Sequence, residues 1–190
     1  MTLTPRTTIT ALAYIASIIA SNWLVATFGI ITVIPGTEIS GPAGVYLIGI
    51  TLALRDLLQD RVGPFMTIPF MLIGVVISAA FSPTLALASS AAFLVAELLD
   101  MAVYTPLRKR GWITAAVLTS NTVGLILDTV IFLTIAFGTL AYWEGQVIGK
   151  IIGTLFAVAA LRFIYRRRDN LIPHYIQRKE AAKRGEPVLV

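Results

Sequence analysis

Four ionisable side chains stand inside stretches of the sequence that are otherwise apolar: Glu97, Asp100, Asp128 and Lys150. A charge at the centre of a membrane-spanning helix costs about 2.5–3.5 kcal/mol even on the scale derived from insertion experiments. Such charges persist where they face one another, a polar cavity or a substrate. The sequence therefore predicts that the functional site lies in the interior of the protein.

Helical spacing groups several polar residues onto common faces. Glu97 and Asp100 are three residues apart, which places them on one side of a helix. Asn121, Gly124 and Asp128 share a second stripe, in which the glycine leaves room between two polar side chains. A carboxylate accepts hydrogen bonds and an amide can both donate and accept them, so these faces suit a ligand with donor groups.

Depth in the membrane can be estimated from the rise of 1.5 Å per residue. Asn22, Asp128 and Lys150 each lie about 12–13 Å below the expected outer end of their helix. A shared depth predicts one polar pocket near the midplane. The candidate substrate-binding residues are Asn22, Glu97, Asp100, Asn121, Asp128 and Lys150.

Structural roles compete with binding at these positions. Asp128 and Lys150 could form an ion pair that locks two helices together, with or without a pocket beside it. Asn22 and Asn121 could make hydrogen bonds between helices, worth about 0.6 kcal/mol on average in membranes. Asp100 could extend to the cytoplasmic interface.

The composition indicates a membrane protein. The chain has 190 residues, of which 57% are hydrophobic and 13% charged, whereas soluble domains carry about 25% charged residues. Its formal charge is +5, but the basic residues form short clusters beside apolar runs. That placement is typical of membrane orientation signals and argues against a nucleic-acid partner.

Cysteine and histidine, which often serve in catalysis and metal binding, are almost absent from the sequence. There is no cysteine, and the one histidine, His174, lies in the polar C-terminal region. The buried acids do not have a recognisable metal-ligand spacing, and no intramembrane protease motif is present. We therefore expect no enzymatic activity, no catalytic residue, no metal and no cofactor.

Apolar runs long enough to cross a bilayer predict an all-α, polytopic membrane protein with six transmembrane helices. The expected helices are 9–30, 43–59, 63–81, 84–105, 112–137 and 142–165. The second run is the shortest, and a partly re-entrant course is an alternative for it. The helices make up one domain, 1–165, and a basic tail follows at 166–190. The first run lacks a clear cleavage site, so we expect a retained helix and not a signal peptide.

Charge asymmetry predicts the orientation of this bundle. The connections at 31–42, 82–83 and 138–141 contain no Lys or Arg, whereas the other connections and the tail contain them. Basic segments stay on the cytoplasmic side. We therefore expect a multi-pass protein of the cell membrane with both termini in the cytoplasm.

Several local patterns occur in a characteristic order. They are Ser21–Asn22, Arg55–Asp56 before Gly63, AELLD at 96–100, VYTPLRKRGW at 103–112, TSN at 119–121, LDTVIFLTIAF at 127–137, and Lys150. Together they resemble the vitamin uptake transporter family, over about residues 14–165. Standalone members of that family import queuosine precursors.

The resemblance implies a six-helix bundle similar to the substrate-binding components of energy-coupling-factor transporters. It also implies a planar deazapurine substrate, 7-cyano- or 7-aminomethyl-7-deazaguanine. Asn22, Asp100, Asn121, Asp128 and Lys150 match positions characteristic of the family, and so does Asp56. A flat ring also needs an apolar slot, for which the candidates are Phe93, Tyr104, Phe132 and Trp23.

Three functions stay open at this point. The first is a secondary transporter of a queuosine-type base, and the second is a substrate-binding subunit of an ATPase-driven uptake complex. The third is a purely structural membrane protein whose polar groups satisfy one another. The oligomeric state is left open between a monomer and a homodimer.

Overall fold

The computed structural model describes residues 4–109 and 113–164, apart from some side chains within the helices. The basic tail predicted at 166–190 lies outside the described residues. Six α-helices and two short strands follow one another along the described chain. They are α1 (Pro5–Phe28), β1 (Ile30–Thr32), β2 (Ser40–Pro42), α2 (Val45–Val62), α3 (Pro64–Ser78), α4 (Pro83–Lys109), α5 (Ile113–Phe137) and α6 (Trp143–Ile164).

The predicted helical runs match these six helices to within a few residues. Proline marks several of the starts, because it lacks the amide hydrogen that the first turn cannot use. Pro5 begins α1, where the Thr4 side chain accepts a hydrogen bond from the amide of Thr7, and Pro64 begins α3. The second run forms an uninterrupted helix of 18 residues, α2.

The connection expected at 31–42 contains secondary structure that the sequence did not predict. β1 and β2 pair as an antiparallel hairpin, with Ile30 opposite Pro42 and Thr32 opposite Ser40. Gly36 lies in the connecting loop with φ of 82°, a backbone conformation that residues other than glycine rarely adopt. The hydroxyl of Tyr46 in α2 donates a hydrogen bond to the Val33 carbonyl, which ties the hairpin to the bundle.

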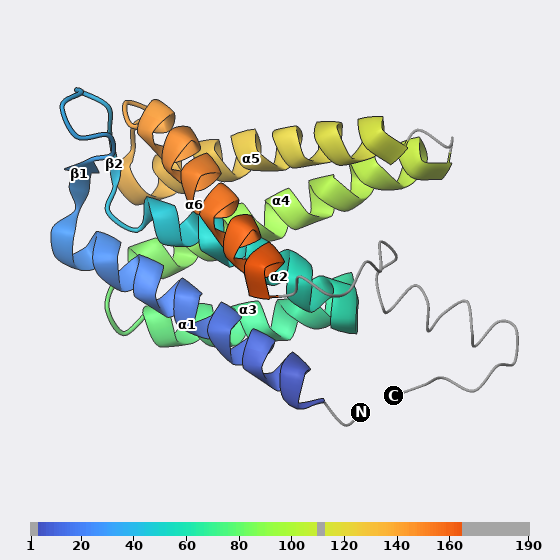
Figure 1. Ribbon diagram of the computed structural model, residues 1–190. Helices are drawn as coiled ribbons and strands as arrows, with labels where there is room; N and C mark the ends of the chain where they lie inside the picture. The colour runs from blue at the N-terminus through green and yellow to red at the C-terminus, as the bar shows by residue number, and fades with distance from the viewer. Residues whose placement is uncertain (1–3, 110–112, 165–190) are drawn as a thin grey trace, which may run out of the picture.

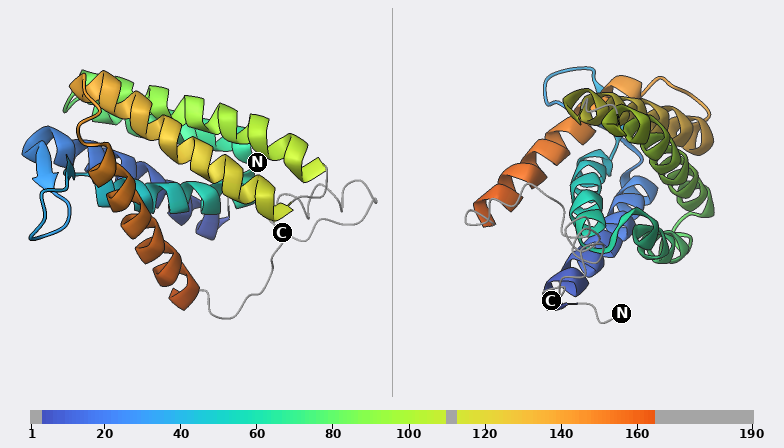
Figure 2. Two further views of the ribbon diagram at one scale, coloured as in Figure 1. Left: turned by 90° about the horizontal axis from the view of Figure 1, so that it is seen from above. Right: turned by 90° about the vertical axis from the view of Figure 1, so that its right-hand side faces the viewer.

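The helices run alternately back and forth between two ends of the molecule (Figure 1). The links α1–α2, α3–α4 and α5–α6 lie at the end that carries the hairpin, which we call the hairpin end. α4 and α5 run side by side, whereas α6 diverges from them (Figure 2). α2 is the central helix, and Asp56 is its one exposed residue among those whose side chains are described.

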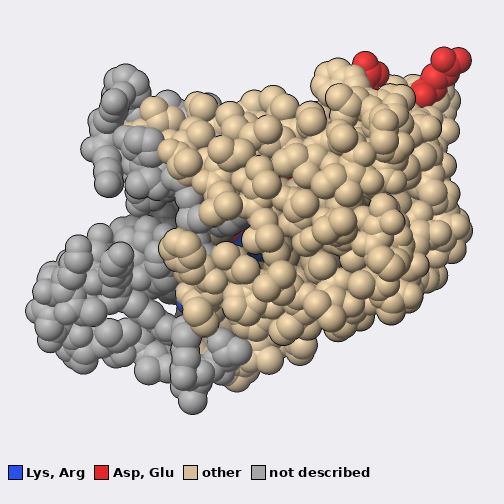
Figure 3. Space-filling view, turned by 180° about the vertical axis from the view of Figure 1, so that it is seen from behind, with Lys and Arg blue, Asp and Glu red and all other residues tan. Residues whose placement is uncertain are grey.

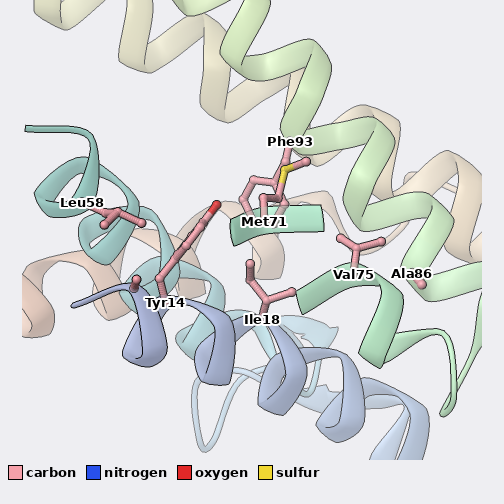
Figure 4. Close-up of a cluster of buried hydrophobic side chains, with 8 residues drawn as sticks. Tyr14, Ile18, Leu58, Met71, Val75, Ala86 and Phe93 are labelled. Carbon is pink, nitrogen blue, oxygen red and sulfur yellow. The ribbon is translucent and has the colours of Figure 1, made fainter. Parts of the chain in front are cut away.

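Two apolar clusters hold the bundle together. The larger one joins α1, α2, α3 and α4 around Tyr14 and Ile18, which are each 1% exposed (Figure 4). The second joins α1, α4 and α5 through Val25, Ala92 and Leu133. Neither cluster includes a residue of α6, so the position of α6 depends on other contacts described below.

The outer surface of the bundle is apolar. Large hydrophobic side chains are exposed on α1, α3, α4, α5 and α6, including Phe65 at 68% and Phe156 at 68%. Figure 3 shows a surface on which few described residues are charged, with acidic groups at one end. An apolar surface of this extent is typical of contact with lipid or with another protein.

Length and composition alone give a narrower result for membrane spans. Among the described residues, Pro5–Phe28 is the one helix that is both long and apolar enough to cross a bilayer. Three shorter apolar segments are Phe65–Ser78, Pro83–Ala96 and Thr122–Phe137. The presence of six helices is confirmed, and the number that span a membrane stays a prediction.

Candidate functional site

Glycines position α6 against the central helix. A methyl group at Gly153 would lie 2.1 Å from the carbonyl oxygen of Tyr46, and one at Gly149 would lie 2.4 Å from a methyl carbon of Val45. On the α2 side, a methyl group at Gly49 would lie 2.3 Å from the carbonyl oxygen of Lys150. Such separations are too short for any side chain, so the two backbones touch directly. This contact fixes the backbone of Lys150.

The side chain of Lys150 is fully buried and pairs with α5. Its ammonium group donates hydrogen bonds to Oδ2 of Asp128 and, over 3.0 Å, to Oγ1 of Thr129. The Lys150 side chain is 0% exposed and that of Asp128 7% exposed. The ion pair predicted from the shared depth of these residues is therefore confirmed.

The partners of the ammonium group are themselves oriented. The Thr129 hydroxyl donates to the Leu125 carbonyl over 2.7 Å, which directs its lone pairs toward Lys150. Among the described residues, the second carboxylate oxygen of Asp128, Oδ1, accepts no hydrogen bond. A carboxylate oxygen has two lone pairs, so this atom keeps its full capacity to accept.

A cavity of about 240 Å³ adjoins the ion pair. Four helices supply its walls, and both Asp128 and Lys150 belong to them. The lining residues are Leu52, Arg55 and Asp56 of α2, Phe93 and Ala96 of α4, Gly124, Leu125 and Asp128 of α5, and Lys150, Ile151, Thr154 and Leu155 of α6. The lining combines apolar side chains with five polar residues, four of which are ionisable, and a mixture of apolar walls and placed polar groups suits a small organic ligand.

The cavity extends from the ion pair toward the end of the molecule opposite the hairpin. There, Nη2 of Arg55 lies 2.9 Å from Oδ1 of Asp56, and Nε of Arg55 donates to the same oxygen over 3.1 Å. The Asp56 side chain is 60% exposed and that of Arg55 14% exposed. One end of the cavity thus carries a buried ion pair, and the other carries a partly exposed one.

Asn22 lies in a different environment from the one expected. Its side-chain oxygen accepts a hydrogen bond of 2.8 Å from the Ser89 hydroxyl, so that it links α1 to α4. Asn22 is 4% exposed and is not among the described residues that line the cavity. The interhelical hydrogen bond, weighed in the sequence as the alternative to ligand binding, is present here.

Three further candidates belong to described helices, but their side chains lie outside the described residues. Glu97 and Asp100 are in α4, and Asn121 is in α5. Their part in a site is taken up below as a proposal. Of the aromatic candidates, Phe93 lines the cavity, whereas Trp23 is 45% exposed and contacts Phe28 edge-on.

Two threonines, one beside the ion pair and one in the cavity wall, carry no signal in the sequence. Thr129 and Thr154 are ordinary helix residues by spacing, and only the packing of α6 shows that Thr129 meets Lys150. Thr154 donates a hydrogen bond of 3.1 Å to the Gly49 carbonyl and lines the cavity at the junction of α2 and α6. The clearest available signal was the glycine spacing of α6, which indicates a close helix contact.

A helical bundle with an apolar exterior, and a cavity beside a buried ion pair, is an arrangement suited to binding a small molecule. The protein-family model described as "Putative vitamin uptake transporter" matches residues 65–166, more than half of the chain. The chain belongs to this family. Searches of the curated proteins and of the solved structures found no match to the chain.

Proposed function

We propose that the protein imports a queuosine precursor, 7-cyano- or 7-aminomethyl-7-deazaguanine, into the cytoplasm. Membership of the uptake family supports transport. The observation that carries the substrate class is the carboxylate of Asp128, which lines the cavity. One of its oxygens binds Lys150, and the other has no hydrogen-bond partner among the described residues. The proposal also rests on the order of the motifs described in the sequence.

The chemistry of a guanine-like base suits this carboxylate. Such a base presents a ring N–H and an exocyclic amine as neighbouring donors. Oδ1 of Asp128 accepts one of them, while the Lys150 ammonium binds the other oxygen of the carboxylate. A charged acceptor makes a stronger hydrogen bond than a neutral one, so the site discriminates against rings that lack donors.

The walls of the cavity suit the flat faces of the base. Phe93 and Leu52 supply apolar surface from α4 and α2, and Ile151 supplies it from α6. Gly124 has no heavy atom within 4 Å of the place where a Cβ would stand, so that the ring can approach the backbone of α5 there.

Helical spacing adds three residues to the proposed site. Asp100 follows Ala96 by four positions, Glu97 follows Phe93 by four, and Asn121 precedes Gly124 by three. Residues three or four apart share a helix face. In the proposal, Asp100, Glu97 and Asn121 therefore contribute further polar contacts to the cavity that Ala96, Phe93 and Gly124 line.

Uptake into cells tests the function. Cells that cannot make the precursor receive the gene, and queuosine in their transfer RNA is measured with either deazaguanine supplied. Wild-type protein should restore queuosine, whereas Asn121→Ala and Glu97→Gln should restore less at equal protein levels. If well-expressed wild-type protein restores none with either base, the substrate assignment is wrong.

Purified protein in liposomes separates a secondary transporter from a subunit of an ATPase-driven complex. We expect the chain alone to move the base across the membrane, and to bind it with an increase in melting temperature. Binding without movement, restored by a co-purified ATPase module, would support the alternative.

We further propose that six helices span the membrane with the hairpin end outside. Among the described residues, Glu38 and Glu144 are exposed at the hairpin end, and Arg6, Arg55 and Arg61 lie toward the other. Cysteine introduced at Thr37 should react with an impermeant reagent in intact cells, and cysteine at Lys109 only after permeabilisation. The reverse pattern would overturn the orientation.

A further inference from the structure

Gln146 is a buried amide without a partner. Its side chain is 0% exposed, and neither Oε1 nor Nε2 has a hydrogen-bond partner among the described residues. Buried polar side chains in folded proteins nearly always have partners, and each exception needs an explanation. The backbone of Gln146 is satisfied, because its amide donates to the Tyr142 carbonyl over 3.0 Å. The unmet groups are therefore those of the side chain alone.

The position of Gln146 relates it to the cavity. It precedes Lys150 by four residues on α6, which places it on the same face about 6 Å nearer the hairpin. Among the residues of α6 before Lys150, Gln146 is the one buried polar side chain. The cavity lining on α6 begins at Lys150, so Gln146 lies one helical turn beyond the cavity on its hairpin side.

The packing of α6 holds Gln146 in place but supplies no hydrogen-bond partner for its side-chain amide. A methyl group at Gly145 would lie 2.2 Å from the carbonyl oxygen of Ser40, so the first turn of α6 touches β2 directly. Asn22, the other amide with an unpaired buried atom, differs because its oxygen is bound by Ser89. Asn22 thus has a structural partner, whereas Gln146 has none among the described residues.

We propose that Gln146 is a substrate-contacting residue that recognises a cyclic amide (lactam) edge, in which a carbonyl oxygen adjoins a ring N–H. A primary amide presents an acceptor and donors side by side, so it can make two reciprocal hydrogen bonds with that edge. The contact forms in a conformation in which the cavity extends past Lys150 toward the hairpin. The inference rests on the proposed function and adds a second polar contact to it, separate from Asp128.

The test combines a change in the protein with a change in the ligand. Gln146→Met keeps the length of the side chain and removes the amide. The two probes are 7-cyano-7-deazaguanine and the matching 2-amino-7-deazapurine, which lacks the carbonyl oxygen and the adjacent ring N–H. Kd for each is measured by calorimetry on purified full-length protein, together with the melting temperature without ligand.

We expect Gln146→Met to raise Kd for the lactam probe at least about ten-fold and to leave Kd for the lactam-free probe unchanged. The melting temperature without ligand should stay equal or rise, because an unsatisfied buried amide is removed. Gln59→Met, the same change in α2 at a residue that does not line the cavity, is the matched control and should alter neither Kd.

Two results would overturn the inference while the proposed function stands. One is that wild-type protein binds the lactam probe and Gln146→Met leaves its Kd unchanged. The other is that the variant loses stability and weakens both probes equally, which is the result expected of a structural residue. If Gln146→Met does not fold, both Kd values are measured on Gln146→Leu, which also lacks the amide, and the same results support or overturn the inference. Wild-type protein that binds neither probe contradicts the proposed function itself.

Discussion

α6 contacts the helices α2 and α5 in opposite ways. Against α2, glycines bring the two backbones together, and the Thr154 hydroxyl adds a hydrogen bond to the Gly49 carbonyl. Against α5, the described contacts centre on the ammonium group of Lys150, and a cavity lies beside it. We call the first contact the glycine face and the second the ion-pair face. One face is fixed by shape and the other by charge.

The difference bears on how a transport protein can change conformation. Close-packed backbones are not continuously deformable, so α2 and α6 are expected to move as one body. A polar contact beside a cavity can be exchanged for contacts with a ligand, because the ligand replaces the lost hydrogen bonds. Substrate-dependent movement is therefore expected between α6 and the α4–α5 pair.

The largest expected effect comes from breaking the ion-pair face. Asp128→Asn or Lys150→Met alone leaves one buried charge without its partner, which should lower the free energy of unfolding by about 3–5 kcal/mol. The double variant removes both charges and should recover much of that loss. Unfolding of purified protein in detergent measures all four forms. Strictly additive losses would mean that the two side chains do not interact.

The glycine face should respond to shape and not to charge. Gly49→Ala places a methyl group 2.3 Å from the Lys150 carbonyl oxygen, and we expect a loss of about 3 kcal/mol in the same unfolding experiment. Gly124→Ala on α5 is the matched control, because no heavy atom lies within 4 Å of the added carbon. That control should retain or gain stability, since alanine favours helix, while its methyl group narrows the cavity and weakens binding. Equal losses in both variants would contradict the contrast between the faces.

The sequence allowed the helices and the ion pair to be predicted for different reasons. Apolar runs between prolines and glycines predict helix boundaries, because each of those residues acts locally. Asp128 and Lys150 were predicted to meet because two opposite charges at one depth, on successive helices, leave few other partners. The helix boundaries and the ion pair could both be predicted from where residues stand along the chain.

Features that depend on how helices face one another could not be predicted. The depth of Asn22 was estimated from its spacing, but whether it faced the cavity or Ser89 depended on the rotation of α1. Thr129 reaches Lys150 only because α6 is held against α2. The hairpin was missed because Ser40, Gly41 and Pro42 have low strand propensity, and tertiary contacts override it there.

The smallest effects are expected from replacing a threonine by valine at each of two helix interfaces. Thr129→Val removes a hydrogen bond to the ammonium group of Lys150, and Thr51→Val removes one of 2.9 Å to the Ser17 hydroxyl between α1 and α2. A hydrogen bond to a charged group is worth more than one between hydroxyls, so we expect about 1.5 kcal/mol for Thr129 and about 0.6 kcal/mol for Thr51. Only Thr129→Val should also alter substrate affinity, because Thr129 helps to hold the ammonium group that neutralises Asp128. Unfolding free energies and Kd values for the deazaguanine, measured on both variants, check this. A larger loss of affinity in Thr51→Val would show that binding does not depend on the ion-pair face. A larger loss of stability in that variant would contradict the expected order of the two hydrogen bonds.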